Sequence, residues 1–304
     1  MEITKLVNIG NTCAINSLIQ TLSKFNINIF DKLDANSFTF SLIELLNLMN
    51  NNPGKTIKPN SFIKSLYTHL KNFKKNQQLD VQELWIILSN KIFEETATPY
   101  NNINVQTNYI HKIAFDQLNL HNNFKKSKWD NIFQGSIINI LTCTICSNKS
   151  FKIEPFYSLS MNINNSIINI LKDYFKKEYI NDVNCIKCKT KTTHAKIIKF
   201  YKIPKIFVIS INRYNNTCEK QNDKIQINRS IILGNTILFE NAKNIELNLI
   251  STINHFGNLN NGHYNSLDVI NNKIIDDTDI INVNNDIYNN NQNIYMLFYK
   301  FNFK

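Results

Sequence analysis

The sequence predicts an α+β fold, with helices first and strands afterwards. Over roughly the first 100 residues, apolar side chains recur at the spacing of amphipathic helices. From Phe133 onward the pattern changes to short stretches in which apolar and polar residues alternate, which is typical of strands. Two Cys-x-x-Cys pairs fall inside the β-rich middle. A chain of 304 residues with 43% hydrophobic content can bury a full core, and no Pro/Gly/Ser-rich linker divides it.

The net charge of +11 raises the question of a nucleic-acid partner. The Lys residues are spread along the chain and accompanied by abundant Asn and Ile, a mixture that A/T-rich codons produce without selection for binding, so nucleic-acid binding is disfavoured. The start, Met1–Lys5, lacks a signal-peptide pattern, and no run approaches the roughly 20 apolar residues of a membrane span. We therefore expect no membrane partner and a reducing compartment, cytoplasm or nucleus (of the host cell if the chain is viral).

The first predicted helix begins at Cys13, after the turn-forming Gly10-Asn11-Thr12. Thr12 is the expected N-cap, which places Cys13 in the first helical turn. Unpaired N–H groups and the helix dipole favour an anion there, so a thiol at this position is partly converted to the reactive thiolate. Asn8 is placed to aim its amide donors at the same point and stabilise an oxyanion. The alternative is that Cys13 only packs under a helix start.

Three more helices are predicted in the first hundred residues. Asp80 followed by Glu83 has the capping-box spacing and opens a helix to about Glu95, which explains both carboxylates without a binding role. The other two helices are expected at Phe40–Met49 and at Ser61–Phe73 with Asn60 as its cap.

The remaining two thirds of the chain is predicted to be mainly strands. Residues 101–125 carry little signal and are expected to form a loop, and Asn282–Asn293 is expected to be a surface loop. One helix is expected at Ile167–Phe175. Strands are expected at Ser136–Leu141, Phe151–Ile153, Tyr157–Ile163, Ala195–Tyr201, Ile206–Tyr214, Leu247–Asn254 and Ile294–Phe301, the last third forming an antiparallel core sheet.

The two cysteine pairs are Cys143 with Cys146 and Cys185 with Cys188. Each pair holds one metal ion with two sulfurs, and together they complete a tetrahedral Cys₄ shell. With no open position left for a water molecule, we expect a structural zinc ion that ties the tips of two hairpins, and no catalytic cofactor. Four unrelated thiols and a redox role are the disfavoured alternatives.

His263 follows Gly262 and begins a predicted strand that runs from Tyr264 to Ile270. A hairpin with its turn at Asn271-Asn272 would bring Asp276 or Asp277 within reach of this imidazole. A nucleophilic thiol needs such a base and an acidic group to orient the base, although a Gly-His pair by itself is usually only a turn. The histidines expected at the surface are His69, His111, His121 and His194, whereas His255 lies near the site but lacks an acidic partner in sequence.

Five blocks in order resemble the ubiquitin-specific protease family of papain-like cysteine peptidases. They are Asn8–Gln20, Gln77–Leu84, the two cysteine pairs, Ile203–Tyr214, and Asn254–Tyr264 with Asp276-Asp277 and Tyr295–Tyr299. Three positions depart from the family pattern: Ala14 and Ile15 follow the Cys, and Ile274-Ile275 replaces an aromatic pair. Because these are packing positions, we expect changed affinity or rate and retained chemistry.

The resemblance implies a single catalytic domain, 1–304, shaped like a right hand: mainly thumb in 1–125, mainly zinc-bound fingers in 126–202 and mainly palm in 203–304. Carried over by position, Cys13 is the nucleophile, His263 the general base and then acid, Asp276 its orienter and Asn8 an oxyanion donor. Alignment chooses Asp276 over Asp277, and either acid is able to assist. By the same resemblance, the channel for the ubiquitin tail is lined by Asp80, Glu83 and Tyr264.

The expected function is therefore deubiquitination, the hydrolysis of the bond after the C-terminal glycine of ubiquitin through a thioester. The expected partners are ubiquitin or ubiquitinated proteins, with a ubiquitin-like modifier as an alternative substrate, and the expected state is a monomer. Two rival classes are a ubiquitin-binding pseudoenzyme and a basic zinc-ribbon protein that binds nucleic acid. Linkage preference and physiological substrates lie beyond the sequence.

Overall fold

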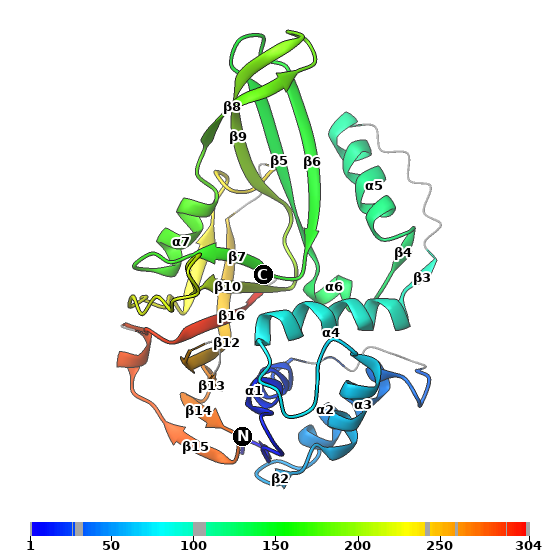
Figure 1. Cartoon of the computed structure of the whole chain (residues 1–304), viewed down its shortest axis with the longest axis vertical. Helices are drawn as coiled ribbons and strands as arrows, with labels where there is room; N and C mark the ends of the chain where they lie inside the picture. Colours follow the sequence, from blue (N-terminus) through cyan, green and yellow to red (C-terminus); the bar gives the residue numbers. More distant parts are fainter. Residues whose placement is uncertain are drawn as a thin grey trace.

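A computed structural model describes residues 2–25, 27, 33–99, 108–240, 244–258, 261–289 and 291–301. The chain folds into a helical layer, a large mixed sheet and a separate four-stranded sheet (Figure 1). The α+β prediction is confirmed. Within the described residues, no helix is both long enough and apolar enough to cross a bilayer.

The helical layer precedes nearly all of the strands. Its helices are α1 (Cys13–Leu22), α2 (Phe38–Asn50), α3 (Asn60–His69), α4 (Val81–Thr96), α5 (Tyr109–His121) and α6 (Asp130–Phe133). Two short ladders accompany them: β1 (Lys5–Leu6) pairs in parallel with β2 (Thr56–Ile57), and β3 (Thr98–Pro99) pairs antiparallel with β4 (Lys125–Lys126).

The large sheet has the strand order β15-β14-β13-β12-β16-β10-β7, and β11 also pairs with β12. All of its ladders are antiparallel except the one between β10 and β7. The strands are β7 (Leu159–Asn162), β10 (Ile206–Asn212), β11 (Ser230–Leu233), β12 (Ile245–Gly257), β13 (Gly262–Asp268), β14 (Lys273–Asp276), β15 (Asp279–Asn282) and β16 (Ile294–Phe301), with α7 (Ile167–Tyr174) and the 3₁₀ turn η1 (Asn285–Tyr288) in the connections.

This sheet separates two apolar cores because successive side chains of a strand point to opposite faces. On β16, Met296 and Phe298 belong to the core shared with α1–α4, whereas Leu297 and Tyr299 belong to the core on the other face, with α7 and β11. Cys13 lies in the first of these cores. The seam between the helical layer and the sheet therefore runs directly along the residue predicted to be the nucleophile.

The second sheet has the order β6-β5-β9-β8 and rises away from the rest of the molecule (Figure 1). Its strands are β5 (Gly135–Cys143), β6 (Lys149–Phe156), β8 (Glu178–Cys185) and β9 (Thr190–Lys202). Helix α5 packs beside β6, where the Gln117 side chain accepts a hydrogen bond from the Ile153 amide at 2.7 Å. A groove of about 810 Å³ opens between α5, β6 and β7.

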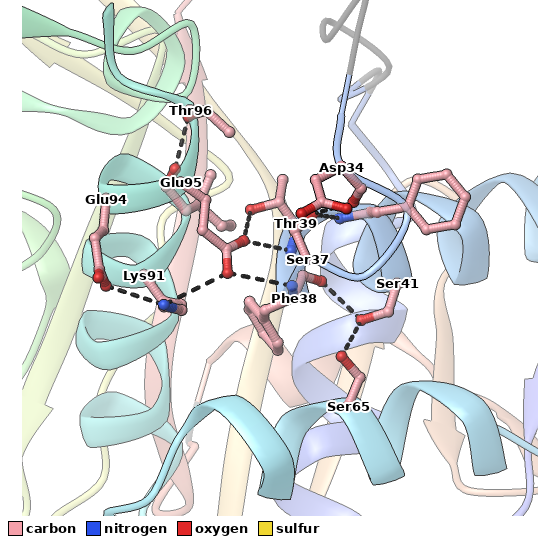
Figure 2. A network of polar contacts seen from close by, with 12 residues as sticks. Asp34, Ser37, Phe38, Thr39, Ser41, Ser65, Lys91, Glu94, Glu95 and Thr96 are labelled. Atoms are coloured by element: carbon pink, nitrogen blue, oxygen red, sulfur yellow. Dashed lines mark hydrogen bonds and ion pairs between the residues drawn. The ribbon is translucent and has the colours of Figure 1, made fainter.

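Glu95, near the C-terminal end of α4, fastens α4 to the start of α2 (Figure 2). Its carboxylate accepts from the backbone N–H of Phe38 at 3.2 Å and of Thr39 at 2.8 Å, and from the Thr39 hydroxyl at 2.7 Å. Lys91, one turn earlier on α4, lies 3.5 Å from the same carboxylate. An acidic group from a different helix thus satisfies two of the unpaired N–H groups of α2, and the Ser37 hydroxyl accepts from a third, that of Phe40.

Several local predictions were wrong in detail. Residues 109–121 form helix α5 where a loop was expected; the stretch 100–107 lies outside the described residues. Asn60 is the first residue of α3, and Pro59 takes the cap position. The expected surface loop Asn282–Asn293 contains η1, and its Tyr288 and Asn291 are buried. His194 is buried too, whereas it was expected at the surface.

Candidate active site and metal centre

Cys13 is the first residue of α1, and its side chain is buried at the seam. The turn before it needs left-handed backbone at Gly10, with φ of 110°, and at Asn11, with φ of 51°. Asn8 holds this turn, since its Oδ1 accepts from the Gly10 and Thr12 amides at 3.1 and 3.2 Å.

Thr12 occupies the N-cap position, as predicted, but its side chain does not cap α1. Its hydroxyl turns back, accepting from the Ile9 amide and donating to the Asn8 side chain, both at 3.1 Å. The predicted N-cap position is therefore confirmed, while the Thr12 hydroxyl serves the preceding turn. The consequence favours chemistry at Cys13, because the first N–H groups of α1 stay available to a developing negative charge.

His263, the second residue of β13, faces Cys13 from the sheet side of the seam. Its Nε2–H donates to Asp276 Oδ1 at 2.5 Å, which leaves Nδ1 as the ring nitrogen for the thiol. The hydrogen bond with Cys13, helped by the bond to Asp276 and its charge, raises the pKa of His263 to about 9 in spite of partial burial. Residues from opposite ends of the chain thus form a sulfur–imidazole–carboxylate row, as the sequence predicted.

Asp277 makes different contacts from its neighbour Asp276. Its carboxylate accepts from the Asn8 side-chain amide at 2.9 Å and from the Asn16 side-chain amide at 2.7 Å. The residue adopts a left-handed φ of 50°, which turns its side chain away from the direction taken by Asp276. Asp276 pairs with the imidazole, and Asp277 fastens α1 and the loop before it to the end of β14.

Asp80 is the N-cap of α4, as predicted, and accepts from the amides of Gln82 and Glu83 at 2.8 and 3.0 Å. Its second carboxylate oxygen accepts a hydrogen bond from the Tyr295 hydroxyl. Glu83 stands exposed in the first turn of α4. Tyr264 is buried nearby, and burial together with the charge of Asp80 raises its phenol pKa.

Three residues around Asp80 were not predicted as part of the site: Tyr214, His255 and Tyr295. The Tyr264 ring lies 4.5 Å from the His255 ring and 6.0 Å from the Tyr295 ring, centroid to centroid. Tyr214 bonds to His255 Nδ1 at 3.2 Å. Burial, with the nearby charge of Lys220, lowers the pKa of His255 to about 4, so this imidazole is neutral at physiological pH. The only sequence signal for this group was that each member lies in a family block.

Gln78 links the two sides of the seam next to His263. Its side-chain amide donates to the Gly262 carbonyl at 2.6 Å and accepts from the Gly262 N–H at 2.9 Å. Glycine is required at 262, because a Cβ there would lie 2.1 Å from His255 Nε2. Gln78 and His255 thus both fix the position of Gly262, the residue just before His263.

The predicted metal ligands come together at the tip of the four-stranded sheet. The sulfurs of Cys143, Cys146, Cys185 and Cys188 all lie within 4.8 Å of one another. Two of the distances are 3.9 Å, between Cys143 and Cys188, and 3.5 Å, between Cys146 and Cys185. A tetrahedron of zinc–sulfur bonds of about 2.3 Å has sulfur–sulfur edges of about 3.8 Å, so the cluster fits a zinc ion.

The two cysteine pairs have the same local geometry. In each, the residue after the second Cys adopts left-handed backbone, Ser147 with φ of 58° and Lys189 with φ of 54°. Its N–H bonds to the carbonyl of the first Cys, at 3.0 Å in one pair and 2.8 Å in the other. Each Cys-x-x-Cys is therefore a closed turn that presents both sulfurs on one side.

Solved structures identify the fold. The chain superposes on the SAGA Ubp8/Sgf11/Sus1/Sgf73 DUB module bound to ubiquitin aldehyde with a TM-score of 0.73 and 22% identity, covering 98% of this chain and 69% of that one. A yeast SAGA DUB module gives a TM-score of 0.75 over 98% of this chain and 68% of that one, at 22% identity. The expected papain-like fold of the ubiquitin-specific protease type is confirmed.

Sequence relatives agree with the fold. The chain is 26% identical to ubiquitin carboxyl-terminal hydrolase 11 of Saccharomyces cerevisiae over 88% of this chain and 50% of the relative. It is 26% identical to the probable ubiquitin carboxyl-terminal hydrolase 4 of Schizosaccharomyces pombe over 97% of this chain and 58% of the relative. The chain thus spans between half and three fifths of the length of these relatives.

The family model described as ubiquitin carboxyl-terminal hydrolase matches residues 4–299, nearly the whole chain. With Cys13, His263 and Asp276 in a row at the seam and four sulfurs clustered at the sheet tip, the chain belongs to the ubiquitin carboxyl-terminal hydrolase family.

Proposed function

We propose that this chain is a thiol-dependent deubiquitinase that hydrolyses the bond after the C-terminal glycine of ubiquitin. The observation that carries the proposal is the contact of Cys13 with His263, whose other ring nitrogen is bonded to Asp276 at 2.5 Å. The match of a ubiquitin carboxyl-terminal hydrolase model to residues 4–299 supports the substrate class.

The reaction proceeds in two halves. The Cys13 thiolate attacks the glycine carbonyl, and the first N–H groups of α1, with Asn8, hold the oxyanion. The His263 imidazolium, which carries the thiol proton, gives that proton to the leaving amine, and a thioester remains. His263 then takes a proton from water, the hydroxide attacks the thioester, and the proton returns to the departing sulfur. Asp276 keeps the ring oriented throughout.

The tail and the folded body of the substrate contact two different surfaces. Asp80, Glu83 and Tyr264 line the channel for the ubiquitin tail in this proposal, supported by the contacts of Asp80 and Tyr264 beside the row of three residues. The groove between α5, β6 and β7 is a concave surface for the folded body of ubiquitin. A zinc ion held by the four sulfurs supplies structure at the tip and no chemistry at the bond.

The wider assignments belong to the same proposal. Residues 1–125 act mainly as thumb, 126–202 as fingers and 203–304 as palm, and the protein works in the cytoplasm or nucleus. The monomeric state stays a prediction, because the similar solved structures contain further subunits. Light scattering of the purified chain tests it directly.

Release of a fluorophore from the C terminus of ubiquitin tests the activity. Wild-type protein is expected to turn over this substrate and to be labelled by ubiquitin with a C-terminal electrophile, whereas Cys13→Ala is expected to do neither. Binding without labelling would point to a pseudoenzyme. Labelling by a ubiquitin-like modifier in preference to ubiquitin would reassign the substrate, and salt-sensitive RNA retention that depends on Lys residues but not on Cys13 would favour a nucleic-acid function.

A further inference from the structure

A buried ion pair closes the far end of α1, away from Cys13. Lys24 Nζ lies 2.6 Å from Asp268 Oδ2, and the side chains are 14% and 0% exposed. Burial opposes ionisation of Asp268, but the hydrogen bond from Lys24 and its charge outweigh burial and hold the carboxyl pKa below its ordinary value. No residue of this pair belongs to the row of three described above.

The Asp268 carboxylate also shapes the turn that leads into β14. It accepts from the Ile270 and Asn271 amides at 3.1 Å each, and from the Asn271 side chain at 2.8 Å. Asp268 is the last residue of β13, the strand that carries His263, and β14 ends on Asp276. One carboxylate therefore contacts Lys24, two residues after the end of α1, and also accepts hydrogen bonds from the turn of the hairpin that carries both other members of the row.

Helix α1 and strand β13 cover similar lengths between the sulfur–imidazole contact and the ion pair. From Cys13 to Leu22 helix α1 rises about 14 Å at 1.5 Å per residue, and Lys24 follows two residues beyond its end. From His263 to Asp268 the strand extends about 17 Å at 3.3 Å per residue. The two elements therefore start at the sulfur–imidazole contact, run side by side and meet again at the ion pair.

Apolar packing alone does not determine how far α1 sits along the sheet. Burial of apolar surface is non-directional, so the apolar face of α1 tolerates a small slide. A slide would leave the Asp268 charge buried without its partner, which is costly, so the ion pair favours one position at this end of α1, as the bond from Asn16 to Asp277 does near Cys13. A second tie points the same way: Thr21 donates to Ser251 Oγ at 3.0 Å, and Ser251 donates to the Leu267 carbonyl at 3.0 Å.

We propose that Lys24 and Asp268 are positioning residues, which set the register of α1 against the β13–β14 hairpin and thereby the alignment of Cys13 with His263 and Asp276. The consequence for turnover rests on the proposed deubiquitinase function. The consequence for the Cys13–His263 contact does not, because it is a property of the protein without substrate.

The test uses the full chain with the double variant Lys24→Met/Asp268→Asn. Asn keeps an acceptor for the turn amides, and no lone charge stays buried. Lys24→Arg keeps the charge. Lys91→Met is the matched control, because Lys91 is similarly shielded (20% exposed) and also pairs with carboxylates, but on α4, far along the chain from the row (Figure 2). Thermal unfolding of each variant is measured first.

NMR titration of the His263 ring, assigned by loss of its signal in His263→Asn, gives a readout that loss of stability alone does not move. Wild type, Lys24→Arg and Lys91→Met are expected to titrate near pH 9. The double variant is expected to titrate at least about one pH unit lower, towards the ordinary value of about 6.5, because the bond to Cys13 lengthens.

Turnover of the ubiquitin–fluorophore substrate supplies a second readout. In the double variant kcat is expected to fall roughly tenfold or more while KM changes by less than about twofold, as a shift in alignment predicts. A folded double variant with wild-type titration and kcat would overturn the proposal. If wild type itself does not cleave ubiquitin, the proposed function fails, yet the His263 titration still decides the inference.

Discussion

The tip of the four-stranded sheet and the seam between α1 and β13 are stabilised in different ways. At the tip, β8 is almost wholly exposed and four sulfurs gather where apolar side chains are few. At the seam, the core shared with α1–α4 packs against one face of the sheet, and buried polar contacts such as Lys24 with Asp268 are added to it. The comparison teaches that the reactive contact is set by many side chains at once, whereas the tip depends on one cluster.

Loss of the His263 imidazole should give the largest loss of activity. It tests whether the chemistry takes place at the seam. His263→Ala removes the partner of the Cys13 thiol, so kcat/KM for fluorophore release is expected to fall by roughly 10³-fold or more. His69→Ala, at the last residue of α3 and outside the proposed site, should leave it unchanged. An active His263→Ala protein would remove the basis for placing chemistry at the seam.

Alkaline pH should lower both the activity and the stability that depend on His263 at the seam. Because the pKa of His263 is raised to about 9, the imidazolium that accompanies the thiolate is lost above that pH, and kcat/KM is expected to fall there. The stability that this group contributes is full below the unfolded pKa of about 6.5 and is lost as pH rises through about 9. Thermal unfolding of wild type and His263→Ala across this window measures the difference, which should shrink as pH rises. A constant difference would contradict the raised pKa.

Removal of one sulfur should act mainly at the tip. Cys185→Ser is expected to lower the zinc content and to accelerate amide exchange in the tip residues by roughly 10²-fold or more, because metal binding there is coupled to folding. Labelling of Cys13 by the ubiquitin electrophile should survive in part. Cys218→Ser, an exposed cysteine outside the cluster, is the control. Equal zinc content in both variants would refute the Cys₄ site.

The smallest effect is expected within the helical layer. Glu95→Gln weakens the cap on α2 and removes its charge, so a loss of about 1 kcal/mol of unfolding free energy is expected. Glu94→Gln makes a matched comparison, since Glu94 bonds to the same Lys91 but is 71% exposed and caps nothing. Chemical denaturation of both variants measures the difference, and an equal loss in the two would show that the cap contributes nothing.

The parts of the site that were predictable are those whose signals lie within a few residues. Gly10-Asn11-Thr12 marks a turn before a helix, Asp80 with Glu83 marks a helix start, and each cysteine pair has metal-ligand spacing. Such patterns are local, so the sequence displays them directly. The hairpin that brings Asp276 to His263 was predictable for the same reason.

Contacts between distant segments that lie outside the family motifs were not predictable. Lys24 and Asp268 are ordinary charged residues until the fold brings α1 onto β13. His194 was expected at the surface, yet it lies buried beside Thr192, which contacts Cys143. Helix α5 was also missed, and only Ala114 in it is fully buried.

The two closed turns at Cys143–Ser147 and Cys185–Lys189 affect how the tip binds a metal ion. Each turn is closed by its own backbone hydrogen bond. A metal ion is therefore bound by two bidentate cysteine pairs rather than by four independent thiols. A cysteine pair that dissociates from the ion can rebind before the ion escapes, because the other pair still holds it. Slow metal exchange is the behaviour that such chelation produces.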